Sequence, residues 1–222
     1  MKKTLLALSV LAAAGSAQAF ELYNQDGVTV DMGGDIEVVY MQGLEKDSEF
    51  QQEIQDADVK FDVRYAMTDS VQFGAFFELQ DTGTKPGDTY VAVYTETMGS
   101  LKVGQLCTAL DDAGIGADYQ YGMTTFFGGA DGREFCLDEA VRYDIDTGSF
   151  YATVAMAQDK AGTNTAIGTN SVFLDTRIGY RVADFDFTVL GGTTETDAKK
   201  TETLLGAEVR YAGVENLNLA AA

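Results

Sequence analysis

The sequence contains no histidine, no tryptophan, one proline and only 15 basic residues among its 222. Histidine is the commonest metal ligand and general base near neutral pH, so its absence removes the usual zinc sites and the usual catalytic triads. The basic residues face 35 acidic ones, which gives a formal net charge of −20. Nucleic acid is excluded as a partner because phosphate binding needs clustered positive charge. After residue 19 no run reaches about 18 apolar residues, so we expect no transmembrane helix.

The first 19 residues have the features of an export signal. Two lysines follow Met1, residues 4–14 form an apolar run, and residues 17–19 (AQA) give the small-x-small pattern that a signal peptidase recognises. We predict a signal peptide over 1–19 and a mature chain over 20–222. The apolar run is shorter than the roughly 20 residues that span a bilayer, which disfavours an N-terminal anchor.

Glycine and aromatic residues are abundant, and apolar residues alternate with polar ones along most of the chain. The sequence has 24 Gly, 13 Phe and 11 Tyr, a composition that favours β-structure. Between residues 27 and 41 the even positions are apolar or glycine, while the odd positions include Asp31, Asp35 and Glu37. Period-two alternation is typical of a strand with one apolar and one polar face. The pattern recurs at 57–67, 71–79, 141–145, 150–156, 172–181, 184–189 and 202–211.

Alternation alone fits two architectures, a membrane barrel with its apolar face outward and a soluble sandwich or barrel with that face inward. Long connections near 42–53, 82–88, 107–137, 159–170 and 192–200 alternate with short ones at 68–70, 97–100, 146–148, 182–184 and 212–216. Long loops at one end, short turns at the other and strands of about ten residues favour the membrane reading. We therefore predict an all-β, transmembrane, antiparallel up-and-down β-barrel. The alternative is an exported soluble β-rich surface binding protein, such as an adhesin or a lectin.

Several segments of the chain resemble the general bacterial porins of the outer membrane. The most specific part comprises residues 101–105 (LKVGQ), 111–119 (DDAGIGADY), 127–132 (FGGADG) and 140–144 (AVRYD). Residues 20–24 (FELYN) and 58–65 (DVKFDVRY) are also similar to that family. The similarity covers most of the predicted mature chain.

This resemblance implies a 16-stranded, homotrimeric barrel whose third long loop folds into the lumen, with acidic loop residues facing basic residues of the wall. The matching constriction loop is 107–137, and its acids are Asp111, Asp112, Asp118, Asp131 and Glu134. The matching wall cations are Lys60, Arg64, Lys102 and Arg142, of which Arg142 matches best by position and facing. Alternation indicates about eleven strands, so we expect residues 20–222 to be the N-terminal two-thirds of a longer barrel.

The two cysteines lie at the two ends of the predicted constriction loop. Cys107 and Cys136 are the only cysteines, and an even count in an exported protein favours a disulfide. The bond would close the loop at its base and contribute on the order of 3 to 4 kcal/mol in the chain-entropy model. Two reduced thiols are the alternative.

The function that these features predict is a passive diffusion channel for small hydrophilic solutes and ions. Acids outnumber bases on the predicted lumen face, which predicts weak cation selectivity. Those acids are Asp31, Asp35, Glu37, Asp58, Asp62, Asp175, Asp184, Asp186 and Glu208. We expect no enzymatic activity, cofactor or bound metal, because a barrel hydrolase would need a base in place of histidine and no acidic segment matches the calcium-binding loop. The expected partners are the solutes, outer-membrane lipid and two further copies of the chain.

Overall fold

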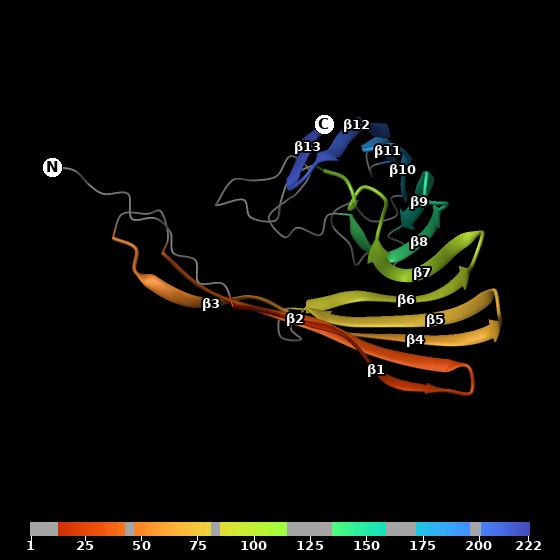
Figure 1. The fold of residues 1–222 in the computed structure, drawn as a ribbon, viewed down its shortest axis with the longest axis horizontal. Helices are drawn as coiled ribbons and strands as arrows, with labels where there is room; N and C mark the ends of the chain where they lie inside the picture. The colour runs from red at the N-terminus through yellow and green to blue at the C-terminus, as the bar shows by residue number, and fades with distance from the viewer. Residues whose placement is uncertain (1–12, 43–46, 81–84, 115–134, 159–171, 196–200) are drawn as a thin grey trace. The chain divides into compact units, whose positions relative to one another are not determined.

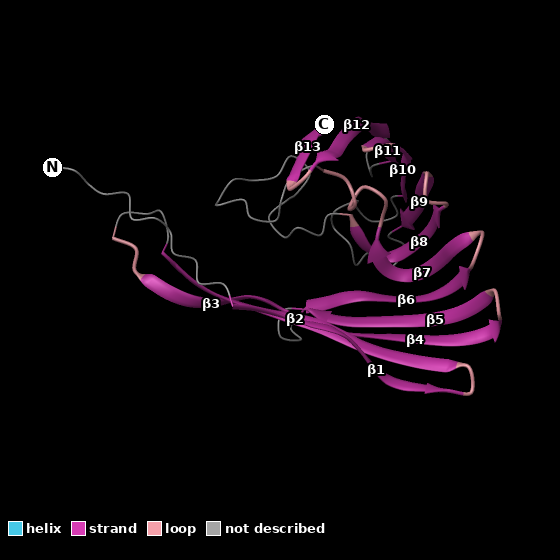
Figure 2. Ribbon diagram, in the orientation of Figure 1, coloured by secondary structure: helices cyan, strands magenta, loops and turns pink. Residues whose placement is uncertain are grey.

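The computed structural model describes residues 13–42, 47–80, 85–114, 135–158, 172–195 and 201–222. In these ranges the chain forms strands joined by turns and loops, as Figure 2 shows. No helix in the described part of the chain is long and apolar enough to cross a membrane.

Thirteen strands are described, and they form one antiparallel sheet (Figure 1). They are β1 (Ala13–Gln25), β2 (Val28–Gln42), β3 (Phe50–Ala57), β4 (Val59–Thr68), β5 (Val71–Gln80), β6 (Lys85–Thr95), β7 (Gly99–Cys107), β8 (Cys136–Asp146), β9 (Phe150–Gln158), β10 (Val172–Val182), β11 (Phe185–Glu195), β12 (Thr201–Val214) and β13 (Leu217–Ala221). Sheet order follows chain order, except that β3 pairs with β2 beside the main path. The predicted all-β, antiparallel, up-and-down fold is confirmed.

The count of thirteen corrects the prediction of about eleven strands. β3 lies where a long connection at 42–53 is predicted, and it pairs with β2 from Gln42 opposite Phe50 to Ile36 opposite Ala57. Phe50 and Ile54 are its only large apolar residues, and the polar run 51–53 between them leaves the alternation too weak to mark the strand in the sequence. Backbone pairing and side-chain contacts such as that of Tyr40 Oη, which donates to Gln52 Oε1 at 2.8 Å, form it instead.

β1 begins inside the predicted signal peptide. Residues 13–17 pair with β2 between Gly34 and Val38, and residues 20–25 pair with β2 between Val28 and Met32. Cleavage after residue 19 stays a prediction.

The described residues form two compact units. Unit 1 comprises Met1–Arg64 and Phe76–Gly87, and unit 2 comprises Tyr65–Ala75 and Asp88–Ala222. In unit 1 the apolar side chains of β2, β3, β4 and β5 are exposed, among them Ile36, Tyr40, Ile54, Val63 and Phe77. This exposed set is the apolar face that the alternation predicts.

Unit 2 shows which side of its strands is covered. The large apolar residues on one side of β9, β10 and β11 are exposed, among them Val154, Met156, Leu174, Ile178, Phe187 and Val189. The opposite side, which we call the loop face because the segment 108–114 packs on it, carries the buried polar residues Thr153, Asp175, Thr188 and Glu208. Apolar outward and polar inward is the reverse of a soluble β-protein and matches strands that face lipid.

A small apolar core lies on the loop face beneath the segment 108–114. It comprises the buried residues Leu106, Leu110, Leu137, Ala140, Ala157, Phe173 and Leu190. A bulge between β7 and β8 contributes to it, because the register passes from Gly104 opposite Ala140 to Leu106 opposite Leu137. The extra residue on β8 brings both Leu137 and Ala140 to the buried side.

Candidate functional site

The start of the predicted constriction loop lies across the loop face of unit 2. Two carboxylates hold it from β10 and β12. Asp175 accepts hydrogen bonds from the backbone N–H groups of Ala109 at 3.2 Å and Leu110 at 2.8 Å. Glu208 accepts the N–H of Gly114, and the guanidinium of Arg210 donates to the carbonyl of the same residue. Residues 109–114 are therefore tied to the wall by their backbone as well as by the packing of the Leu110 side chain.

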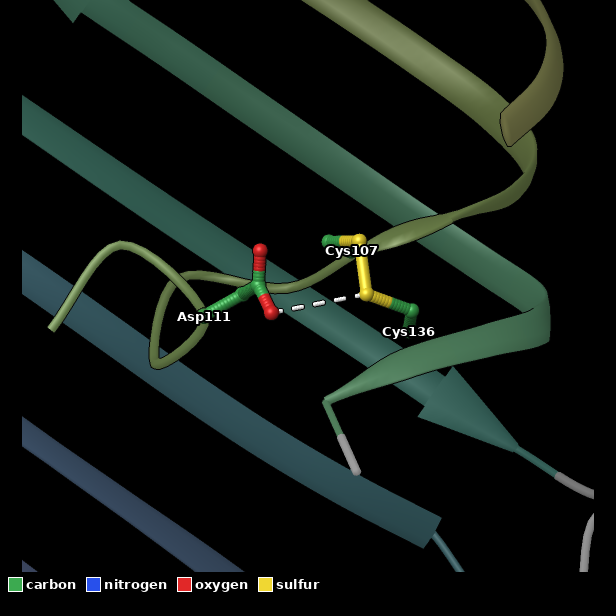
Figure 3. Close-up of side chains that lie close together, drawn as sticks. All are labelled: Cys107, Asp111 and Cys136. Carbon is green, nitrogen blue, oxygen red and sulfur yellow. Dashed lines mark hydrogen bonds between the residues drawn. A yellow bond between two sulfur atoms is a disulfide. The ribbon is translucent and has the colours of Figure 1, made fainter. Parts of the chain in front are cut away.

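A disulfide closes the loop at its base. Cys107 is the last residue of β7, Cys136 is the first residue of β8, and the two are directly opposite each other in the sheet. Their sulfur atoms are bonded, as Figure 3 shows. The predicted bridge is confirmed, and the 29-residue separation of its ends makes it the covalent boundary of the loop.

Arg142 joins the loop to the wall. Its guanidinium forms ion pairs with Asp112 of the loop at 2.6 Å and with Asp144 of its own strand at 2.8 Å. It also donates to the carbonyls of Cys107 at 3.1 Å and Thr108 at 3.3 Å. A planar group with five donors can satisfy this many acceptors at once, and a lysine in its place could not.

A tyrosine between two arginines forms the neighbouring part of the wall. Gly179 lies directly opposite Tyr151 in the sheet, and a Cβ at that glycine would come within 1.9 Å of the tyrosine ring. The missing side chain leaves room for the ring to pack over β10. There the guanidinium groups of Arg177 and Arg181 lie 5.0 and 4.2 Å from the ring centre, which is cation–π distance. The ring hydroxyl also donates to Asp186 at 2.8 Å.

These groups line a cleft of about 410 Å³ on the loop face of unit 2. Its walls carry the ionic residues Arg142, Arg177, Arg181, Asp112, Asp144 and Asp146. Three positive and three negative groups make the cleft formally neutral, whereas the whole chain carries −20. The Nε of Arg177 is buried and has no hydrogen-bond partner among the described residues.

The structure brings only part of the predicted constriction set together. Asp111 and Asp112 lie at the loop start, Asp112 pairs with Arg142, and Lys102 pairs with Asp144 at 3.1 Å. Lys60 and Arg64 belong to unit 1, where Lys60 is exposed and Arg64 pairs with Asp62 at 2.8 Å. The three loop acids that lie outside the described residues are Asp118, Asp131 and Glu134.

Sequence reasoning missed the residues that hold the loop. Asp175 and Glu208 are predicted as acids that line the lumen, but they are 1% and 5% exposed beneath the loop start. It also gave no role to Tyr151, whose polar-face position opposite a glycine was the available signal. To predict that a loop covers an acid, one must know the path of the loop in the folded chain. The alternation of apolar and polar residues does not give that path.

An antiparallel sheet with an exposed apolar face, and a loop packed on its polar face, defines a membrane-inserted β-protein. A family model described as Gram-negative porin matches residues 4–222. The chain belongs to this family, which places it in the outer membrane.

Individual relatives agree with that assignment. Porin-like protein H of Photobacterium profundum is 35% identical over 192 residues, which cover 84% of this chain and 56% of that protein. The major outer membrane protein of Pasteurella multocida is 29% identical over 163 residues, which cover 64% of this chain and 44% of that protein. The chain thus spans about half the length of these curated relatives.

A solved structure shares the fold. In-vitro folded OmpT, an outer membrane protein of Vibrio cholerae, matches with a TM-score of 0.67 at 18% identity. The match covers 90% of this chain and 64% of that one. At this identity the likeness shows a common fold.

Proposed function

We propose that this chain forms a passive diffusion channel for small hydrophilic solutes and ions across the outer membrane. The observation that carries the proposal is the pair of opposite faces in unit 2. Apolar side chains are exposed on one face, and the other face is polar and carries the start of a loop held by two carboxylates. A polar face that lines water and a loop that narrows the passage are the parts a diffusion pore needs.

The proposal includes weak cation selectivity. Asp175 and Glu208 lie under the loop and do not face the passage, so they leave the set of acids that attract cations. The other predicted lumen acids remain, together with the paired charges of the cleft, which is formally neutral; these acids are Asp31, Asp35, Glu37, Asp58, Asp62, Asp184 and Asp186. Because negative wall charge raises the local cation concentration, a modest preference for cations is the expected result.

The proposal also includes a cleaved signal peptide over 1–19, a homotrimer and the absence of enzymatic activity. The chain has no histidine, so the cleft cannot hold the usual nucleophile and base pair. The family resemblance supports the trimer, and the exposed apolar faces offer area for contact with lipid or with other copies. N-terminal sequencing of the mature protein tests the cleavage, and light scattering in detergent tests the trimer.

Planar-bilayer recording of the native protein, purified from outer membranes in detergent, tests the channel. We expect stepwise conductance, with openings in groups of three for a trimer. Under a salt gradient, the reversal potential should have the sign of cation preference. An anion-selective reversal potential would contradict the selectivity, and a protein that raises no conductance would contradict the channel.

A reductant arm of the same recording tests the covalent closure of the loop. Breaking the Cys107 to Cys136 bond removes the cross-link, but the hydrogen bonds to Asp175 and Glu208 remain. We expect added current noise with little change in mean conductance. If confirmed reduction adds no current noise, the hydrogen bonds alone are sufficient to hold the loop.

A further inference from the structure

Of the three arginines that line the cleft, one has no acidic partner. Arg142 and Arg181 each form ion pairs with two aspartates. The side chain of Arg177 is partly buried and forms no ion pair or hydrogen bond in the part of the chain that the structure describes, and its Nε is buried. A charged donor that is taken out of water without an acceptor costs free energy. Arg177 is therefore the cleft arginine that can bind an anion from outside the chain.

The place of the Arg177 guanidinium follows from its contact with Tyr151. The guanidinium lies 5.0 Å from the centre of that ring. The tyrosine itself is 5% exposed, and its Oη donates to Asp186 at 2.8 Å. A cation–π contact attracts the positive charge but offers no oxygen or nitrogen acceptor, so the N–H groups of Arg177 still need one. Because Arg177 lines the cleft, a ligand that enters the cleft can supply that acceptor.

The charges around Arg177 limit the kind of anion that fits. The acids that line the cleft are Asp112, Asp144 and Asp146, and each is paired with an arginine other than Arg177. The lining as a whole is formally neutral, so a single added negative charge meets less repulsion from these acids than a double one. A phosphate monoester carries about 1.5 to 2 negative charges at pH 7, whereas a carboxylate carries one. A planar carboxylate also matches two parallel N–H groups of a guanidinium.

We propose that Arg177 anchors a binding site for small organic acids in this cleft, and that the group it recognises is the carboxylate. Two N–H groups of the guanidinium donate to the two carboxylate oxygens. The rest of the acid occupies the cleft, whose volume of about 410 Å³ is in the range of small-molecule sites. A weak cation preference of the whole channel does not conflict with one such site, because selectivity depends on all the wall charges. A role of the site in solute passage rests on the proposed channel, but binding to the folded chain does not.

Lactate titration of the native protein in detergent tests the site. Binding is followed by saturation-transfer NMR at constant ionic strength, and lactamide, which lacks the charge, is the ligand control. We expect saturable binding of lactate and binding of lactamide that is weaker by about tenfold or more. In R177Q the affinity for lactate should fall about 10- to 100-fold, because a charged hydrogen-bond donor is lost. R177K keeps the charge but loses the parallel donors, so its affinity should lie between those of R177Q and the unchanged chain.

K60Q is the matched control for the loss of charge. It removes one positive charge, as R177Q does, but Lys60 is exposed on β4 and is not among the residues that line the cleft. We expect K60Q to bind lactate as the unchanged chain does. Competition experiments separate the two classes of anion, since methyl phosphate should displace lactate less than an equal concentration of acetate does.

The proposal is wrong if lactate and lactamide bind equally, if R177Q keeps its affinity for lactate, if K60Q loses as much affinity as R177Q, or if methyl phosphate displaces lactate better than acetate. Full affinity in R177K would contradict the two-point contact with the carboxylate. The β-sheet circular dichroism spectrum shows that each variant folds, and if R177Q does not fold, the affinity of R177K decides alone.

Planar-bilayer conductance of the same samples separates this site from the channel. A protein that conducts but does not bind lactate would disprove the site and leave the channel proposal standing. A protein that binds lactate but does not conduct would disprove the channel and leave the site.

Discussion

Replacing Asp175 by alanine should release the start of the constriction loop from the wall. The carboxylate is 1% exposed and accepts the backbone N–H groups of Ala109 and Leu110, which are themselves buried. No other described acceptor is in hydrogen-bond contact with these two donors. The substitution therefore leaves two buried donors unsatisfied, and opening the segment to water is the way to satisfy them.

The size of the effect follows from the two hydrogen bonds. A hydrogen bond to a charged group contributes about 1.5 to 3 kcal/mol. The two bonds share one carboxylate, so we count about 3 kcal/mol for the pair and not their full sum. At about 1.4 kcal/mol for each tenfold change, the population of the open segment should rise about 100-fold.

Amide hydrogen exchange measures that population at the residues concerned. In D175A we expect exchange at Ala109 and Leu110 to be about 100-fold faster, while amides in the middle of β10 keep their rates. D184N is the matched control, since it removes one acid from the exposed turn between β10 and β11. Unchanged exchange at both amides would refute the role of the two Asp175 hydrogen bonds. The disulfide and the packing of Leu110 would then be the contacts that keep the segment on the wall.

Three further predictions concern the other contacts of the loop face. In E208A the amide of Gly114 loses its charged acceptor and should exchange about 10- to 100-fold faster, as measured by the same method. In G179A the new methyl group meets the Tyr151 ring, so the free energy of unfolding should fall by about 1 to 3 kcal/mol in a denaturant titration, and an unchanged midpoint would contradict the packing. In R142A Asp112 loses the counter-charge of Arg142 and Asp144 keeps only that of Lys102, so the cation preference of a salt-gradient reversal potential should rise, by about fivefold at most.

The strands that the sequence predicts are those with one apolar face. β2, β4, β5 and β8 to β12 all show clear alternation, because side chains of a strand point to opposite sides and only one side meets an apolar surface. β3 was not predicted because the polar run 51–53 separates its two large apolar residues, Phe50 and Ile54, and because backbone pairing does not require an alternating sequence. Alternation alone also did not decide whether the apolar face points outward to lipid or inward to a core, since both environments require apolar residues at the same positions.

The candidate site was predictable only where residues are close in sequence or fixed by covalent chemistry. The disulfide followed from two cysteines in an exported chain, and the strand position of Arg142 followed from its place in the alternation. The contacts of Asp175 and Glu208 with the loop join residues 65 to 94 positions apart. Such contacts depend on the path of the loop in the folded chain. The sequence around an acid on the polar face is the same whether water or a loop covers its side chain.

A side chain that holds the loop and a charged side chain that lines the cleft should therefore have different effects in a conductance recording. Asp175 is buried, so in the proposed channel its removal would act on selectivity only through the position of the loop, whereas Arg142 lines the cleft and its charge would act directly on passing ions. We expect D175A to change current noise more than reversal potential, and R142A to change reversal potential more than noise. Equal shifts of reversal potential in the two variants would mean that the charge of Asp175 acts on the ions directly. That result would contradict the role of Asp175 as a buried anchor of the loop.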